Sequence, residues 1–162
     1  MFTQTELKRL LRYDPETGVF TWLVSNRRVK VGDVAGRLCL REYRQIGINS
    51  TVYFTHRLAW FYMTGVWPAD QIDHIDGCRA NNKFSNLREA TGSQNMHNSK
   101  KHSNNTSGFK GVSWYKRNKK WTAQIQVSNK QIHIGCYDDP QEAHAAYCAA
   151  AEAHHKEFAR TA

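Results

Sequence analysis

The chain has 162 residues, with 23 Lys and Arg against 14 Asp and Glu, which gives a formal net charge of +9. This length suits one ordinary domain or two small ones, so the chain holds no large multidomain assembly. Because 40% of its residues are hydrophobic and 12% are aromatic, the chain can bury a core, which argues against wholesale disorder.

Neither a membrane span nor an export signal is expected. No apolar run approaches about 18 residues, and the first residues lack the apolar core of a signal peptide. The four cysteines (Cys39, Cys78, Cys136 and Cys148) form no C-x-x-C pair, so a disulfide framework and a structural zinc site both fit poorly. The sequence therefore predicts a protein of the reducing cytoplasm.

Positive charge is concentrated in one part of the chain. From Ala90 to Tyr137 no residue is acidic. The same stretch holds basic residues and aromatic residues together: Lys100, Lys101, Lys110, Lys116, Arg117, Lys119, Lys120, Lys130, His97, His102, His133, Trp114, Tyr115 and Trp121. This mixture favours a nucleic acid as partner, with affinity that falls steeply with salt. A solvated face that only keeps the protein soluble is the alternative.

The first seventy residues predict two helices and several strands. Thr3 and Glu6 have capping-box spacing ahead of an apolar stripe formed by Leu7, Leu10 and Leu11. The further expected elements are a strand at 19–23, two strands at 43–48 and 51–54 joined by a two-residue turn at Asn49 and Ser50, and a helix at 56–64 that ends at Gly65.

The next segment has the order strand, loop, strand, helix. A strand at 71–75 meets a turn at Asp76-Gly77, and an Asn-rich loop leads to an extended segment at 86–90. Thr91 and Gln94 form a second capping box, which places Asn95 in the first turns of a short helix.

The last third predicts a separate module after a linker. Residues 99–108 contain no apolar side chain, which is typical of a linker. Three strands are expected at 111–115, 121–127 and 131–137. A helix follows, with Asp139 as its N-cap and Pro140 at its first position. Small alanines on one side of that helix suit close packing on a three-stranded sheet.

The pair Asp73-His74 carries the clearest chemistry. The oxygens of Asp73 and Asn95 suit one Mg²⁺ or Mn²⁺ ion, and His74 can accept a proton from an attacking water near neutral pH. Neighbours on a regular strand point to opposite faces, so both side chains can serve one phosphate only if the strand ends or bends there. A polar pair at a strand end and a surface Asn, without chemistry, are the alternative.

The full set of motifs resembles a known family. It comprises Thr55-His56-Arg57-Leu58-Ala59, Ile72-Asp73-His74-Ile75-Asp76-Gly77, Asn81-Asn82, Asn86-Leu87-Arg88 and Gln94-Asn95-Met96-His97-Asn98. From about Tyr13 to Ser99 the chain is similar to the HNH (ββα-metal) endonucleases, above all the phage free-standing and intron-encoded homing group. The resemblance implies that His74 is the general base, that Asp73 and Asn95 are the metal ligands, and that Asn86 ties the loop together without doing chemistry.

Three further positions of this resemblance have two readings each. His56 either packs against the nuclease core or takes part in catalysis, and the packing reading is favoured. Arg57 and Arg88 either hold phosphates of the cut strand or are structural. Other HNH branches carry His where this chain has Asn95, which implies weak metal binding in the absence of DNA.

The C-terminal module carries a second set of motifs: Ser107-Gly108-Phe109-Lys110-Gly111-Val112, Trp121-Thr122-Ala123-Gln124-Ile125, Ile134-Gly135-Cys136-Tyr137 and Glu142 to Tyr147. With these motifs it resembles the plant ethylene-response-factor (APETALA-type) DNA-binding domain, which implies a three-stranded sheet that lies in the major groove. Positions that match DNA contacts are Lys110, Gly111, Ser113, Tyr115, Arg117, Gln124, Gln126, Gln131, His133 and Tyr147. Several family arginines are replaced here, so the plant target sequence does not transfer. For Trp114 and Trp121, plain sheet packing is at least as good a reading.

Together these observations predict an α+β protein in two modules. Residues 1–99 form an HNH nuclease domain with preceding β-hairpins and a motif core at 55–99, residues 100–106 a linker, and residues 107–162 the DNA-binding domain. The expected activity is hydrolysis of double-stranded DNA by a monomeric, metal-dependent phage or mobile-element endonuclease. Removing residues 107–162 should weaken DNA binding but leave cleavage. A non-catalytic transcription regulator and an RNA- or protein-binding module are the alternatives.

Overall fold

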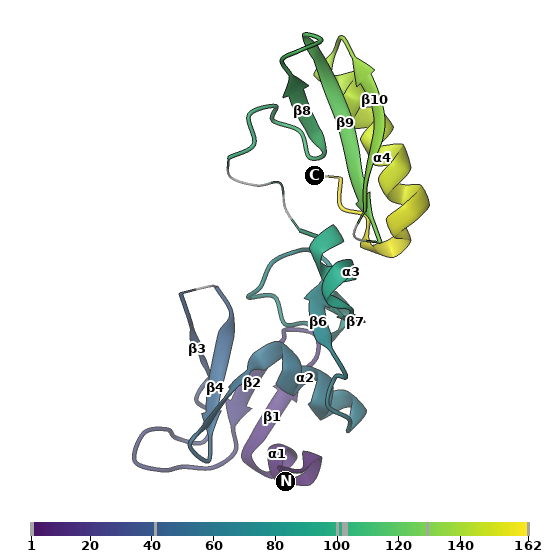
Figure 1. Ribbon diagram of the computed structural model, residues 1–162. Helices are drawn as coiled ribbons and strands as arrows, with labels where there is room; N and C mark the ends of the chain where they lie inside the picture. The colour runs from purple at the N-terminus through teal and green to yellow at the C-terminus, as the bar shows by residue number, and fades with distance from the viewer. Residues whose placement is uncertain (1, 41, 100, 102–103, 129, 162) are drawn as a thin grey trace. The chain divides into compact units, whose positions relative to one another are not determined.

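The computed structural model describes residues 2–40, 42–99, 101, 104–128 and 130–161 (Figure 1). By its internal contacts the chain divides into two compact units, residues 1–90 and residues 91–162. This division lies inside the stretch predicted as one nuclease domain, because the short helix that carries Asn95 groups with the second unit.

The chain begins with helix α1 (Gln4–Leu10) and a β-hairpin. The predicted capping box is confirmed: the Thr3 hydroxyl accepts the N–H of Glu6, and the Glu6 carboxylate accepts the N–H of Thr3. The apolar stripe was expected to run on to Leu11, and that was wrong. Leu11 has an extended backbone and opens strand β1 (Leu11–Asp14), which pairs antiparallel with β2 (Val19–Trp22). Leu11 is fully buried in this conformation.

A three-stranded antiparallel sheet and a helix complete the scaffold of the first unit. Strands β3 (Arg37–Leu38), β4 (Arg44–Ile48) and β5 (Thr51–Phe54) lie in the order β3-β4-β5. Asn49 and Ser50 both have positive φ angles, as a two-residue hairpin turn requires. Helix α2 (Thr55–Thr64) follows directly and ends at Gly65, whose φ of 77° places it in the left-handed region.

The core of the first unit joins these elements. It is apolar and fully or almost fully buried, and it contains Leu7, Leu11, Tyr13, Phe20, Ala35, Ile46, Ile48, Leu58, Ala59, Phe61, Ile72 and Leu87. The last two belong to a two-stranded antiparallel ribbon of β6 (Gln71–His74) and β7 (Leu87–Ala90), with a 3₁₀ turn, η1 (Phe84–Asn86), between them. The core therefore reaches the strand that ends in the candidate site.

The second unit contains helix α3 (Gly92–His97) and the predicted sheet-and-helix module. Strands β8 (Val112–Tyr115), β9 (Lys120–Val127) and β10 (Lys130–Tyr137) form an antiparallel sheet in the order β10-β9-β8. Helix α4 (Pro140–His155) lies along this sheet, and the 3₁₀ turn η2 (Lys156–Phe158) follows it (Figure 1). Asp139 caps α4 as predicted, by accepting the N–H of Gln141.

Close packing between α4 and the sheet depends on small residues. Ala143, Tyr147 and Ala151 are buried at four-residue spacing along α4, and they meet Ala123 and Ile125 of β9. Of the predicted linker at 100–106, residues 100, 102 and 103 lie outside the described residues. The Asn105 side chain donates to the Phe109 carbonyl, so this end of the predicted linker forms a local turn within the second unit. The predicted α+β class is confirmed.

Candidate active site and DNA-binding face

Asp73 lies near the end of β6 and is held by an ion pair. Its carboxylate is only 4% exposed, and its Oδ2 accepts hydrogen bonds from Arg88 Nε at 2.9 Å and Nη2 at 2.8 Å. Arg88 is the cross-strand neighbour of Asp73 on β7, so the strand register brings the two side chains together. Burying an unpaired carboxylate charge would be costly, and the guanidinium of Arg88 balances the charge of Asp73. This pairing gives the structural reading of Arg88 direct support.

His74 is the last residue of β6, so the strand ends at the position where Asp73 and His74 would need it to end in order to serve one phosphate. Its Nε2 lies 3.2 Å from Asn82 Oδ1, while Asn82 Nδ2 donates to the Ala80 carbonyl. With the amide oriented in this way, His74 donates from Nε2, and in the neutral ring the lone pair lies on Nδ1. Burial lowers the pKa of His74, although the bond to Asn82 opposes that shift. The imidazole is therefore neutral at pH 7 and able to accept a proton.

Aromatic rings surround His74. His56, on the first turn of α2, lies with its ring centroid 5.1 Å from that of His74, and Tyr43 lies 6.0 Å away. Among the described residues His56 Nδ1 finds no hydrogen-bond partner, and burial together with the nearby His74 lowers the pKa of His56 to about 3. A neutral, buried ring of this kind supports the packing reading of His56.

The loop between β6 and β7 is closed by side-chain amides. Asn86 Nδ2 donates to Asp76 Oδ1 and to the Asn81 carbonyl, both at 2.9 Å, and Asn86 Oδ1 accepts the N–H of Asp76 at 3.0 Å. Asn81 Nδ2 donates to Asp76 Oδ2 at 2.7 Å. These bonds fix the loop that carries Asn82 and so set the ring orientation of His74.

Asn82 is a site residue to which the sequence assigned no role. It is 2% exposed, and its backbone carbonyl accepts a hydrogen bond from the Tyr13 hydroxyl at 2.7 Å. Gly18, in the turn between β1 and β2, packs so closely that a Cβ there would lie 2.4 Å from the Asn82 carbonyl carbon. The Asn81-Asn82 motif was a sequence signal, but a partner for His74 could not be read from it.

Arg57 also has structural partners. Its guanidinium donates to the carbonyls of Asp70 at 2.7 Å and Pro68 at 3.2 Å, which fixes the segment just before β6. Asn95 lies on α3 in the second unit, where Thr91 and Gln94 form the predicted capping box. The pairing of Asn95 with Asp73 on one metal ion stays a prediction.

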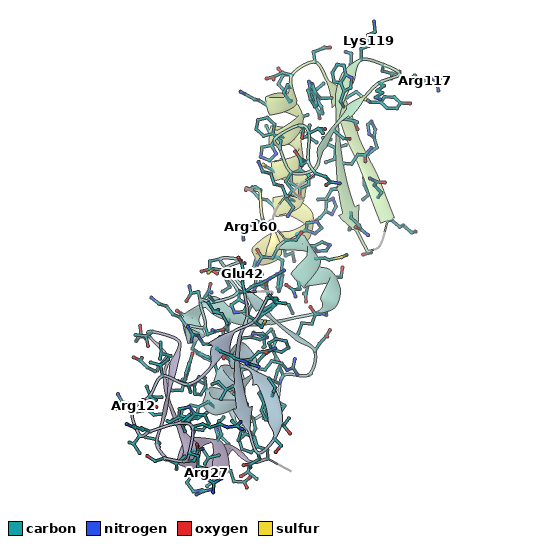
Figure 2. All side chains as sticks on the ribbon, turned by 90° about the vertical axis from the view of Figure 1, so that its left-hand side faces the viewer. Arg12, Arg27, Glu42, Arg117, Lys119 and Arg160 are labelled. Carbon is teal, nitrogen blue, oxygen red and sulfur yellow. The ribbon has the colours of Figure 1, made fainter. Side chains whose placement is uncertain are left out.

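One face of the second unit's sheet is polar and lies opposite α4. Gln124 and Gln126 alternate along β9 with the buried Ala123 and Ile125. The residues predicted to contact DNA that belong to this face or its edge are Ser113, Tyr115, Gln124, Gln126, Gln131 and His133. Thr122 joins the face through a 3.3 Å contact with His133 Nδ1, and Gln131 donates to Gln124. Arg117, with Lys119, projects from the exposed turn between β8 and β9 (Figure 2).

Three other predicted DNA contacts, Lys110, Gly111 and Tyr147, have partners within the second unit. Tyr147 is 5% exposed in the core, and its ring presses on Gly111, where a Cβ would lie 2.1 Å from the ring. Lys110 Nζ donates to the carbonyls of His97 and Ser99. Burial lowers the pKa of Lys110 to about 8, with a further contribution from Arg160. For these residues the structure supports packing and tethering roles.

Trp114 and Trp121 pack on each other. They are cross-strand partners on β8 and β9, and their rings meet edge to face at 5.0 Å, which supports the packing reading. Over the described part of the chain, no cluster of three or more His, Cys, Asp and Glu side chains is arranged to hold a metal ion. Likewise, no described helix has the length and apolar character needed to cross a membrane.

Comparison with known proteins agrees with both resemblances. Residues 53–97 match the HNH endonuclease family, and residues 107–157 match the AP2 domain. The chain thus contains an HNH endonuclease domain followed by an AP2 domain. Over 84 residues it is 37% identical to protein 3.8 of Escherichia phage T7, a match that covers 51% of this chain and 69% of the phage protein. The chain therefore belongs to the family of T7 protein 3.8.

A solved structure is also similar. It is that of the HNH homing endonuclease I-HmuI, which is described as binding and cleaving DNA. The match has 24% sequence identity and a TM-score of 0.43, and it covers 54% of this chain. It spans half the length of that enzyme, 50% of its chain.

Proposed function

We propose that this protein is a metal-dependent endonuclease that hydrolyses a phosphodiester bond of duplex DNA and grips the duplex with its AP2 domain. The observation that carries the proposal is the buried pair at the end of β6, inside the region that matches the HNH family. There Asp73 is ion-paired and His74 presents a neutral imidazole. A carboxylate beside a neutral imidazole supplies a metal ligand and a general base in one place.

The donor set suits a hard divalent cation. The Asp73 carboxylate and the Asn95 amide oxygen would hold one Mg²⁺ or Mn²⁺ ion, since both metals prefer oxygen ligands. Arg88 orients the carboxylate through Oδ2. When bound, the cation would offset the negative charge that builds on the scissile phosphate and on the leaving 3′ oxygen.

The protein's own part in the reaction centres on His74. Its Nδ1 accepts a proton from the attacking water while Asn82 keeps the other ring proton on Nε2. The water oxygen bonds to phosphorus, the bond from phosphorus to the 3′ oxygen breaks, and that oxygen takes up a proton from solvent water. The products are a 5′-phosphate end and a 3′-hydroxyl end.

In this proposal the AP2 domain binds the duplex DNA. Its polar sheet face bears glutamines that can pair with adenine edges in a major groove, and cationic side chains lie at its edge. Duplex DNA fits this face better than duplex RNA does, because the deep A-form major groove is closed to side chains. If the protein acts as a monomer with one site, each binding event gives one nick, or two sequential cuts give a double-strand break.

Cleavage of supercoiled plasmid tests the proposal. The protein is incubated with Mg²⁺, with Mn²⁺ and with EDTA, and the product ends are labelled to distinguish phosphate from hydroxyl. Nicked or linear DNA that needs the metal and carries 5′-phosphate ends is the expected result. Cleavage in EDTA, or a 3′-phosphate product, would overturn the mechanism. Salt-sensitive binding to the same plasmid and to genomic DNA fragments, with no cleavage of either, would instead identify a regulator.

A further inference from the structure

Helix α3, which carries Asn95, depends on support from outside itself. It has six residues, all described, and none of them is buried. A helix this short is unstable alone in water, because the cost of nucleation is spread over few hydrogen bonds. Its final carbonyls also have no partner within the helix. Its N-terminus is capped by Thr91 and Gln94, so the need for support is greatest at its C-terminal end.

Lys110 supplies that support. Its Nζ donates to the carbonyl of His97, the last residue of α3, at 2.8 Å, and to the carbonyl of Ser99 at 2.7 Å. An ammonium group at a helix C-terminus satisfies carbonyls and interacts favourably with the helix dipole. The lysine therefore acts as a C-terminal cap that comes from the AP2 domain.

The backbone of Lys110 is itself anchored to α4. His144 Nδ1 lies 3.2 Å from the Lys110 carbonyl, and the neighbouring Gly111 is pressed against the ring of Tyr147. At the other end of α4, the ring of His155 stacks on that of His97 with centroids 3.6 Å apart and planes at 17°. Helix α3 also packs against η2. Two contacts from the same helix-and-sheet module thus hold α3.

We propose that Lys110 and His155 are positioning residues of the nuclease, which hold α3 and with it Asn95, so that the AP2 domain fixes a metal ligand as well as binding DNA. This inference rests on the proposed function, because Asn95 matters only if it binds the metal. This inference reverses the expectation that a protein lacking residues 107–162 would still cleave DNA, because the deletion removes the contacts of both Lys110 and His155 with α3.

The test compares Lys110→Ala with Lys110→Arg, which restores a donor, and with Lys116→Ala, which removes the same charge from the exposed turn after β8. Amide hydrogen exchange of residues 95–99 is measured without DNA. The concentration of Mg²⁺ that gives half-maximal cleavage is measured separately at saturating plasmid. For Lys110→Ala we expect exchange about tenfold faster and a metal requirement about tenfold higher. Lys110→Arg should recover much of both, and Lys116→Ala should change neither.

The outcomes separate the two proposals. Unchanged exchange in Lys110→Ala would overturn the tether, and faster exchange with an unchanged metal requirement would overturn its link to the metal site. If Lys116→Ala raised the metal requirement equally, loss of charge rather than the tether would be the cause, and the inference would fail. Absence of cleavage by the unmodified protein would defeat the proposed function, whereas the exchange measurement would still decide whether Lys110 holds α3.

Discussion

The two ends of the HNH motif are stabilised in different ways. Asp73 and His74 lie on a strand whose partners come from the first unit: Arg88 across the ribbon, Asn82 in the loop and the core beneath. Asn95 lies on a six-residue helix with no buried residue, and side chains of the AP2 domain hold that helix. The proposed general base is thus held by contacts within the first unit, while the helix of Asn95, the proposed second metal ligand, is held by the AP2 domain. A nuclease arranged like this can make cleavage depend on an intact binding domain.

The largest effect on stability is expected from Arg88→Ala. It leaves the buried Asp73 carboxylate without its cation, so the free energy of unfolding should fall by about 3 kcal/mol. Denaturant titration measures this change, and Arg88→Lys should lose less. If Arg88 served mainly as a phosphate contact, stability would hold while DNA binding weakened, and the ion pair would not be its main role.

Asn82→Ala should lower the cleavage rate about 10- to 100-fold with DNA affinity unchanged, because His74 loses the acceptor that fixes its proton on Nε2. Single-turnover cleavage measures the rate. Tyr13→Phe is the matched control, since it removes the bond to the Asn82 backbone and leaves the His74 contact in place. Equal rate losses in both variants would show that loop order, and not the proton position, matters.

Acid should destabilise the first unit through His56. Its pKa is about 3 when folded and about 6.5 when unfolded, so the unfolded chain binds the extra proton between these values. The free energy of unfolding therefore falls as the pH drops below about 6.5, by up to about 1.4 kcal/mol per pH unit for one proton. In the His56→Phe variant, the slope of the free energy of unfolding against pH should be smaller between pH 7 and pH 5. An unchanged slope would exclude His56 as its source, and the exposed His154→Gln is the control.

The smallest effect concerns the polar face of the AP2 sheet. Gln126 is exposed on β9, so Gln126→Ala should leave stability within about 0.5 kcal/mol and weaken specific DNA binding by about 1 kcal/mol. Binding titrations at two salt concentrations check this. Glu152→Ala, an exposed change on α4, should leave affinity for DNA no weaker. Equal affinities for the wild type and Gln126→Ala on every site tested would remove this face from the proposed interface.

Local signals in the sequence predicted much of this fold. Capping boxes at Thr3 and Thr91, the Asn49-Ser50 turn and the cap of α4 at Asp139 all act over a few residues, so spacing alone reveals them. Leu11 was assigned wrongly because an apolar residue next to a helical stripe fits either a helix or a buried strand. Its pairing with Trp22 decides the matter.

Contacts between distant residues could not be predicted in the same way. The ion pair of Asp73 and Arg88 depends on the register of β6 and β7, and the bond from His74 to Asn82 depends on how the loop closes. The family resemblance marked Lys110 as a DNA contact. Only the packing of α3 on the AP2 domain shows its ammonium group donating to helix carbonyls.

The cleavage rate of the His74→Ala variant decides whether His74 is the base of a metal-dependent nuclease. The rate is measured beside the wild type in Mg²⁺ at saturating plasmid, with DNA affinity determined in parallel. We expect the rate to fall about 10²- to 10⁴-fold with affinity for DNA retained. Cleavage by His74→Ala at the wild-type rate would contradict this role of His74.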